Sequence, residues 1–329
     1  MNKNVAKNVT RRKLKILMVG AGDVARRLTA PDSPVGFSQR ALWFGLARSA
    51  ATAGELRSAG ILQITGDLDW RASLKRAGAM ARAAHAVLHL APPPGEGFDD
   101  PRMQRWLAAA TAATSKPASH QHHNSKLRPR KLRSVYVSTT GVYGDCAGVR
   151  INETRRARPA NARAKRRVAA ETRLRHSHQH RFTILRAPGI YAAERLPVER
   201  LRAGTAALAA EDDVFSNHIH ADDLARAVWL AVFRGGPNRV LNIVDDGELK
   251  MGEYFDQVAD ATGLPRPPRM PRAALKASVS PMLYSFMSES RRIENTRMKR
   301  ELRLRLRYPT PAHFLRTMKP ASALQRSLL

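Results

Sequence analysis

The sequence has very little cysteine, few aromatic residues and no long apolar run. Its single cysteine, Cys146, excludes both a disulfide framework and a cysteine-rich zinc site. No apolar run approaches the roughly 18–20 residues that cross a bilayer. The apolar stretch from Leu14 to Gly22 is too short for a signal peptide and has no cleavage site after it. We therefore expect a cytoplasmic protein that does not contact membranes.

Acidic residues are also scarce, with 27 Asp and Glu against 57 Lys and Arg, which gives a net charge of +30. Such an excess favours anionic partners, namely nucleotides, nucleic acid or anionic lipid. Residues Arg150–Arg181 contain eleven Lys or Arg and two acids, and Lys116–Arg133 contain six and none. Both stretches almost lack the aromatic residues that stack on bases. A solvated basic face is therefore favoured over a nucleic-acid site.

What the sequence does have is 329 residues, of which 43% are apolar, enough for a large α/β domain and a smaller partner. Nearly continuous apolar runs alternate with helix-like stretches, a pattern typical of parallel strands covered on both faces. The strand-like runs are Leu14–Val19, Ala41–Ala47, Ile61–Thr65, Ala86–Ala91, Ser134–Ser138, Phe182–Arg186 and Val240–Val244. The alternation predicts an α/β fold with a doubly wound parallel sheet. Residues 115–133 are polar, basic and proline-containing, which predicts an inserted loop.

The first strand runs into Gly20-Ala21-Gly22-Asp23-Val24-Ala25, which is a G-x-G-x-x-A motif. In such a motif Gly20 allows a tight turn, Gly22 lets the backbone approach a pyrophosphate, and Ala25 permits close packing of helix and strand. The helix start after it offers free N–H groups to phosphates. The strand before the motif, the helix-like residues after it and the βαβ spacing favour dinucleotide binding over a plain strand–turn–helix corner.

The ends of the next strands suggest which dinucleotide is bound. The second strand is followed by Arg48, where an acidic residue would hold the ribose 2′-hydroxyl of NAD. An arginine suits a 2′-phosphate, so NADP is preferred over NAD, unless Arg48 is an ordinary exposed arginine. Asp67 and Leu68 close the third strand and are positioned to reach the adenine. Leu90, Ala91 and Pro92 close the fourth and are candidates for the floor beneath the adenosine.

The fifth strand ends in Ser138-Thr139-Thr140-Gly141-Val142-Tyr143-Gly144-Asp145. With the glycine motif and further matches, the sequence resembles extended short-chain dehydrogenases/reductases of the NAD-dependent epimerase/dehydratase family. The further matches are Asn152–Thr154, Leu185–Tyr191, Ile219–Val228 and Met298–Thr310. The resemblance covers nearly the whole chain. It implies a Rossmann-type domain over 12–195 that takes another strand from 239–245, and a smaller, mostly helical substrate lobe over 196–329.

The resemblance also implies hydride transfer to or from a carbonyl or alcohol carbon, with Pro188 among the cofactor-binding residues. In this family a Ser or Thr orients the substrate oxygen, and a Tyr-x-x-x-Lys pair on the next helix moves the proton. Thr139 matches the hydroxyl position, whereas Arg163 and Arg167 stand where the tyrosine and lysine are expected. Arginine stays protonated and cannot replace a phenol as proton shuttle, although Arg167 could still hold the cofactor. Tyr143 is the nearest phenol in the sequence, and it is either a catalytic candidate or a packed strand-end aromatic.

Other candidate residues have a structural alternative. His218 and His220 are acid/base candidates, but a structural role beside Asp222 and Asp223 is favoured. Ser288–Arg292 either line the substrate cleft or form a solvated helix end, and no metal site is expected. Two functions remain open. One is an NAD(P)-dependent oxidoreductase or epimerase-like enzyme that acts on an unknown small molecule. The other is a catalytically silent NAD(P)-sensing protein with an RNA or protein partner on its basic face. A homodimer is also left open.

Overall fold

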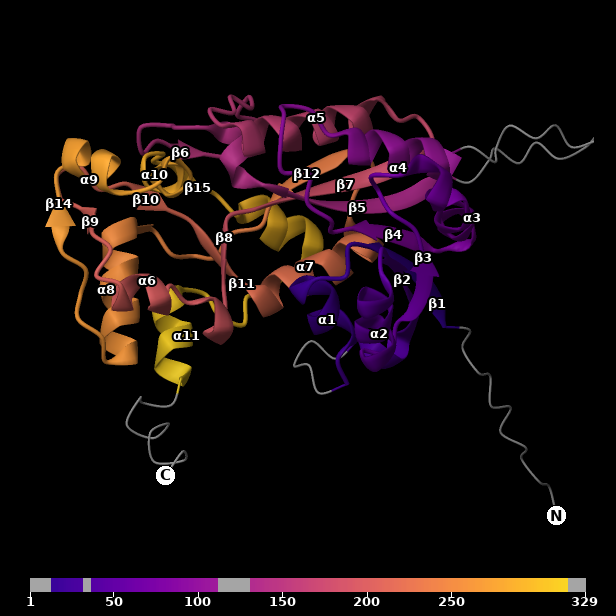
Figure 1. Cartoon of the computed structure of the whole chain (residues 1–329), viewed down its shortest axis with the longest axis horizontal. Helices are drawn as coiled ribbons and strands as arrows, with labels where there is room; N and C mark the ends of the chain where they lie inside the picture. Colours follow the sequence, from indigo (N-terminus) through magenta and orange to yellow (C-terminus); the bar gives the residue numbers. More distant parts are fainter. Residues whose placement is uncertain (1–12, 32–36, 112–130, 319–329) are drawn as a thin grey trace, which may run out of the picture.

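A single parallel sheet organises the chain, whose computed structural model describes residues 13–31, 37–111 and 131–318. Its strand order is β12-β7-β5-β4-β1-β2-β3, and every neighbouring pair is parallel (Figure 1). The strands are β1 (Leu14–Val19), β2 (Ala41–Ala47), β3 (Leu62–Thr65), β4 (Ala86–His89), β5 (Leu132–Thr139), β7 (His180–Ala187) and β12 (Arg239–Asn242). Each overlaps a predicted run, so the doubly wound fold class is confirmed. The strand order reverses between β1 and β4, and ligands of such sheets bind at this point.

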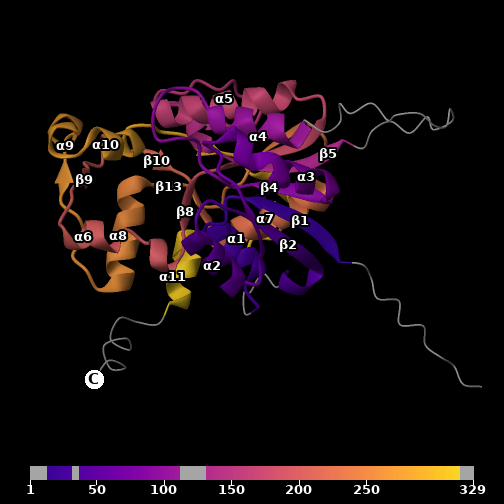
Figure 2. The ribbon, with the colours of Figure 1, turned by 45° about the vertical axis from the view of Figure 1, so that its right-hand side comes forward.

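Both faces of the sheet are covered because both faces of its strands are apolar. In β1, Ile16 and Met18 belong to one core and Leu17 and Val19 to the other, and all four side chains are fully buried. The first core packs against α1 (Asp23–Thr29), α2 (Ala50–Ser58) and α7 (Ala221–Arg234). The second packs against α3 (Lys75–Ala83), α4 (Pro101–Thr111) and α5 (Ala162–His176). The two groups of helices lie on opposite sides of the sheet (Figure 2).

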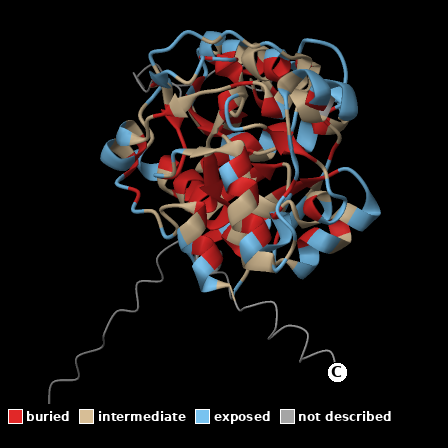
Figure 3. Ribbon diagram, turned by 90° about the vertical axis from the view of Figure 1, so that its left-hand side faces the viewer, coloured by how far each residue is buried: buried red, intermediate tan, exposed pale blue. Residues whose placement is uncertain are grey.

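A second body lies beyond one end of the sheet and is built mostly from the C-terminal part of the chain (Figure 1). Seen from that end, buried residues gather in the interior and exposed residues lie mostly on the outside (Figure 3). It has its own small apolar clusters, around Tyr254, Phe255 and Phe314 and around Leu275 and Met287. Its helices are α6 (Val198–Arg202), α8 (Met251–Thr262), α9 (Arg272–Ser278), α10 (Pro281–Met287) and α11 (Pro311–Thr317). Short strand pairs join them: β8 (Gly189–Tyr191) with β11 (His218–His220), β9 (Ala207–Leu208) with β14 (Arg269–Met270), β10 (Phe215–Ser216) with β13 (Leu249–Lys250), and β6 (Arg150–Ile151) with β15 (Arg292–Ile293).

The division of the sequence at 195/196 does not separate the sheet domain from this lobe in space. The chain returns to the sheet with α7 and again with β12, which lies inside the range 239–245 expected to add a strand. It returns once more at the π-helix Met298–Leu302, whose apolar side chains join the first core. Sheet and lobe therefore alternate along the second half of the sequence.

Two further sequence expectations concern the inserted loop and membrane-spanning segments. Most of the expected loop 115–133 lies outside the described residues, but its last two residues, Leu132 and Arg133, begin β5. Among the described helices, the longest has 15 residues, and none is both long and apolar enough to span a bilayer.

A buried ion pair joins α5 to the sheet. The carboxylate of Glu171, 1% exposed, accepts two hydrogen bonds from the guanidinium of Arg186 on β7, at 3.0 and 2.6 Å. It also accepts one from the hydroxyl of Ser138 on β5, at 2.7 Å, and one from Arg175, at 3.0 Å. Both oxygens of the Glu171 carboxylate are therefore hydrogen-bonded, and the ion pair holds α5 against the carboxyl ends of β5 and β7.

Replacement of Glu171 by Gln should destabilise the fold strongly, because Arg186 would remain buried without a counter-charge. Breaking a buried pair on one side costs about 3–5 kcal/mol. Urea unfolding should therefore show a much larger loss for Glu171→Gln than for Glu55→Gln, whose pair with Arg26 is exposed and long at 3.9 Å. Equal unfolding midpoints for the two variants would contradict this account of the α5 anchor.

Candidate functional site

A cavity of about 500 Å³ opens at the carboxyl ends of β5 and β7, between the sheet and the lobe. Thr139, Arg167 and Pro188, three of the residues predicted from the sequence, line it together. The other lining residues are Val137, Ser138, Thr140, Gly141, Arg163, Ala187, Gly189, Ile190, Arg195, Phe215, Ser216, Asn217, His218, Met251, Ser285, Phe286, Glu289 and Arg291. Other, larger hollows, of about 640, 710 and 560 Å³, lie at the amino ends of β1, β5 and β7, beside α3 and α4, and between α4 and the end of α5. None of these three contains a predicted site residue.

The glycine turn after β1 combines a close backbone approach with open space. Gly20 has φ +94°, and a Cβ there would lie 2.4 Å from the backbone nitrogen of Ala91. The N–H groups of Leu90 and Ala91 both donate to the carbonyl of Val19 at 2.8 Å, which holds the end of β4 against this turn. A Cβ on Gly22 would meet nothing within 4 Å. The start of α1 therefore has room for a ligand above Gly22, as a dinucleotide requires.

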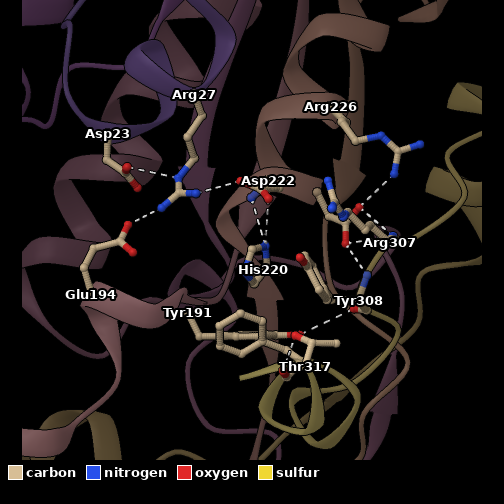
Figure 4. A network of polar contacts seen from close by, with 12 residues as sticks. Asp23, Arg27, Tyr191, Glu194, His220, Asp222, Arg226, Arg307, Tyr308 and Thr317 are labelled. Carbon is tan, nitrogen blue, oxygen red and sulfur yellow. Dashed lines mark hydrogen bonds and ion pairs between the residues drawn. The ribbon is translucent and has the colours of Figure 1, made fainter. Parts of the chain in front are cut away.

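Asp23 and Val24 have partners within the protein. The carboxylate of Asp23 is 3.0 Å from the Nε atoms of both Arg27 and Arg195. Arg27 also donates to Asp222 at 2.6 Å and to Glu194, so its guanidinium lies among three carboxylates (Figure 4). Val24 packs against the first core. The network ties the start of α1 to α7 and to the 3-10 helix Ala193–Arg195, and Asp23 is an ion-pair residue within it.

The residues predicted to bind the adenosine lie at the carboxyl ends of β2, β3 and β4, but they differ in exposure. Arg48 and Pro92 are exposed. Leu68 and Ala91 are buried in the second core, and Leu90 packs in part against the first. The backbone N–H of Asp67 donates to the Ser73 hydroxyl at 2.8 Å, and its carboxylate accepts from the N–H of Asp69 at 2.9 Å. These bonds shape the turn after β3.

The carboxyl end of β5 positions Thr139 and Arg167 in the cavity. The hydroxyl oxygen of Thr139 accepts a hydrogen bond from the N–H of Gly141 at 3.2 Å and begins the 3-10 helix Thr140–Tyr143. Arg167 donates to the Val137 carbonyl at 2.9 Å and to the Tyr136 hydroxyl at 3.1 Å. Helix α5 carries Arg163 and Arg167 one turn apart on the same face. Asn161 caps its start, because the side-chain oxygen of Asn161 accepts a hydrogen bond from the N–H of Ala164.

The structure does not bring Tyr143 to the cavity. Its side chain is 1% exposed, and its hydroxyl donates to the side-chain oxygen of Asn242 on β12 at 2.8 Å. The guanidinium of Arg186 lies 4.7 Å from the centre of its ring. Burial raises the pKa of the Tyr143 phenol above its ordinary value. Its surroundings are those of a packed strand-end aromatic and do not support a role as proton shuttle.

Only one of the two candidate histidines lines the cavity. His218 does, and it packs against Tyr254 with ring centres 4.2 Å apart. His220 instead accepts the N–H of Asp222 at 3.1 Å and caps the start of α7, the structural role favoured from the sequence. Burial lowers the pKa of both imidazoles to about 4. His218 is therefore neutral at neutral pH.

The lobe and the segments next to it add two of the predicted cleft residues and several that sequence reasoning missed, Phe286 among them. Glu289 and Arg291, from the stretch 288–292, line the cavity and form an ion pair at 2.6 Å. Arg195 and Asn217 also line it, although no motif singled them out. Arg195 follows the Leu185–Tyr191 motif and Asn217 directly precedes His218, so their places beside these motifs were the available signal.

The described lining of the cavity has cations and several hydroxyl groups but no tyrosine and lysine pair. Four of its lining residues are arginines, and one, Glu289, is acidic. Among the described residues that line it, there is no tyrosine and no lysine. Lining groups able to exchange a proton with a bound molecule include the Thr139 hydroxyl, the neutral imidazole of His218 and the carboxylate of Glu289.

A family model and solved structures both match this chain. A family model, described as the NAD dependent epimerase/dehydratase family, matches residues 38–243, a range that begins after the glycine turn. A functionally unknown conserved protein from Silicibacter pomeroyi DSS is 27% identical, with a TM-score of 0.72, and the match covers 96% of this chain and 99% of that one. No curated protein matches the sequence.

Two structures with ligands share the fold at lower identity. A UDP-glucose 4-epimerase from Thermotoga maritima, solved with UDP-glucose, is 16% identical, with a TM-score of 0.69 and coverage of 96% of this chain and 100% of its own. A dTDP-glucose 4,6-dehydratase from Bacillus anthracis, in complex with NAD, is 14% identical, with a TM-score of 0.69 and coverage of 92% and 96%. At these identities the likeness concerns the fold alone.

Replacement of Tyr143 by Phe should affect stability and leave ligand binding at the cavity unchanged. The change leaves a buried oxygen of Asn242 without its donor, which costs about 1–3 kcal/mol. Urea unfolding should show this loss, whereas Tyr284→Phe, whose hydroxyl forms no hydrogen bond among the described residues, should show little. If Tyr143→Phe abolished turnover at unchanged stability, the phenol would be a catalytic group after all.

Proposed function

Because this chain belongs to the NAD dependent epimerase/dehydratase family, we propose that it binds a nicotinamide dinucleotide along the carboxyl edge of its sheet. Its reaction would be hydride transfer to or from a carbonyl or alcohol carbon of a small molecule. The observation that carries the proposal is the cavity at the ends of β5 and β7, in which Thr139, Arg167 and Pro188 meet. Substrates of open α/β sheets lie at this edge.

The dinucleotide would extend from the start of α1 to the cavity. The open space above Gly22 supports a pyrophosphate there, because a backbone without a Cβ allows close approach. Exposed Arg48 at the end of β2 suits a 2′-phosphate, so we propose that NADP(H) is preferred over NAD(H). Arg167, held by Val137 and Tyr136, would contact the nicotinamide ribose. When bound, the nicotinamide ring supplies or accepts the hydride.

The residues of the chain would orient the substrate and handle its proton. The hydroxyl oxygen of Thr139 already accepts a bond from the N–H of Gly141, so its own proton is available to a substrate oxygen. Arg163 and Arg167 stay protonated and do not move protons at ordinary pH. The proton would therefore come from the substrate, from water or from a side chain near Thr139, and the neutral imidazole of His218 lies on the same cavity.

The substitution of Arg163 and Arg167 for the Tyr-x-x-x-Lys pair favours a second candidate function. In it the protein binds NAD(P) without turnover and signals the bound state to an RNA or protein partner on its basic face. Tight NADPH binding without oxidation by any carbonyl compound would favour this second function over the first.

The cofactor proposal makes Arg48 the source of specificity. NADP(H) should bind more tightly than NAD(H), and Arg48→Asp should remove or reverse the preference. The loss of a charge-assisted hydrogen bond to a phosphate costs about 1.5–3 kcal/mol, or roughly 10- to 150-fold in affinity. Calorimetric titration with both nucleotides measures this. Arg57→Asp, an exposed charge reversal on α2, is the control and should leave the ratio unchanged. Equal affinities in the unmutated protein would refute the assignment.

The reaction proposal separates the roles of Thr139 and Arg167. Thr139→Ala should lower turnover by about 10²-fold without weakening cofactor binding, because the hydroxyl faces the substrate. Thr139→Ser should keep most of the activity. Arg167→Ala should weaken cofactor binding by about tenfold or more. NADPH oxidation with a panel of carbonyl compounds, together with nucleotide titration of each variant, tests both. The roles are wrong if Thr139→Ala loses cofactor binding as severely as Arg167→Ala does.

A further inference from the structure

The positive charges of the cavity are only partly neutralised. Of its four arginines, Arg195 pairs with Asp23 at 3.0 Å and Arg291 with Glu289 at 2.6 Å. Arg167 donates to two neutral oxygens, and no described residue forms an ion pair or hydrogen bond with Arg163. Two cations thus face the same small cavity without a carboxylate partner among the described residues.

Arg163 is oriented even though it has no ion-pair partner. Its guanidinium carbon lies 3.9 Å from the centre of the Phe286 ring, on helix α10 of the lobe. A guanidinium over an aromatic ring is attracted by the electrons of the ring, and its N–H groups point outward in its own plane. Near the start of α5, the side chain of Asn161 bonds to Glu289, which also lines the cavity. The guanidinium of Arg163 therefore lies against Phe286 at the border between sheet and lobe, where both side chains are partly open to solvent.

Neighbouring charges make this position unfavourable for a cation on its own. The side chain of Arg163 is exposed in part, but desolvation of the remainder, together with the nearby guanidinium groups of Arg167, Arg166 and Arg291, lowers its pKa, and Glu289 offsets this only in part. A bound anion would reverse the balance, because it adds a negative charge among these groups. An arginine that has no carboxylate partner and lies among other cations is suited to bidentate recognition of a planar or tetrahedral oxyanion.

We propose that the cavity takes a small substrate with an oxyanion group, either carboxylate or phosphate, and that Arg163 binds this group. The proposal rests on the proposed function for the identity of the bound molecule as a substrate. The reacting oxygen of the substrate would lie at Thr139, and the oxyanion would lie toward Phe286 and the lobe. A cavity of about 500 Å³ suits a small ligand. Arg163, which stands where the family resemblance implies a tyrosine, would then select substrates that carry an oxyanion.

Direct anion binding, measured without a dinucleotide, tests this proposal. The probes are inorganic phosphate and acetate, titrated to 100 mM at an ionic strength held constant with chloride and monitored by the ¹⁵N resonances of arginine side chains. We expect saturable binding that shifts the Arg163 resonance, with the better probe identifying the oxyanion as phosphate or carboxylate. Arg163→Gln should weaken binding at least tenfold, and Arg163→Lys should weaken it less because the charge remains without the fork.

Lys165→Gln is the matched control, because the protein carries many other positive charges. Lys165 lies on the same helix, is exposed and does not line the cavity. Its Nζ atom lies 4.9 Å from the centre of the Phe98 ring, so it also contacts an aromatic side chain. The Lys165→Gln variant should bind both anions as tightly as the unmutated protein does. Thermal unfolding of each variant checks that it is folded. Equal loss in Lys165→Gln and Arg163→Gln, or no saturable binding of either anion, would overturn the proposal. A failure of NADPH binding or oxidation would overturn the proposed function and leave this result standing.

Discussion

The ion pair between Glu171 and Arg186 is the interaction on which the site depends. Both side chains are almost completely buried, and Glu171 also accepts the hydroxyl of Ser138. One carboxylate thus joins β5, β7 and α5, the three elements that bring Thr139, Pro188 and Arg163 to a common cavity. Arg186 in turn lies over the ring of Tyr143, whose hydroxyl reaches β12. Such a network holds several elements at fixed distances because an unpaired charge in this environment is costly.

The sheet was predictable because its signal is local and repeated. Most strands of the sheet are nearly continuous apolar runs, as in β1, β4 and β7, and burial on both faces requires that pattern. The positions of the side chains at the end of β5 were less predictable. The sequence identified Thr139 and Tyr143 together, but after the strand the chain enters a 3-10 helix that turns Tyr143 into the core and leaves Thr139 at the cavity. A periodic pattern cannot foresee such a turn. The role of Asp23 was also hard to predict, because it forms ion pairs both with Arg27, one helical turn away, and with Arg195, which is far away in the sequence.

Two arginines, at the positions where the family resemblance implies a tyrosine and a lysine, change what α5 contributes. A phenol and an amine can exchange protons near neutral pH when their pKa values are tuned, whereas a guanidinium remains a fixed charge with a rigid fork of donors. In the described cavity α5 therefore contributes fixed positive charges, whereas the Thr139 hydroxyl, the His218 imidazole and the Glu289 carboxylate, which can exchange a proton, come from other elements. The sheet of the family thus borders a cavity whose polar groups differ from the tyrosine and lysine pair that the resemblance implies.

The alternation of sheet and lobe along the second half of the chain restricts how this protein can diverge. The segment from α7 to β12 belongs to the sheet, lobe elements lie on both sides of it, and the chain returns to the sheet again at Met298–Leu302. No single crossover in a gene could exchange this lobe for that of a relative without also replacing the edge strand and a helix of the sheet. New substrate preferences would therefore arise by stepwise substitution within the lobe, on a framework inherited whole.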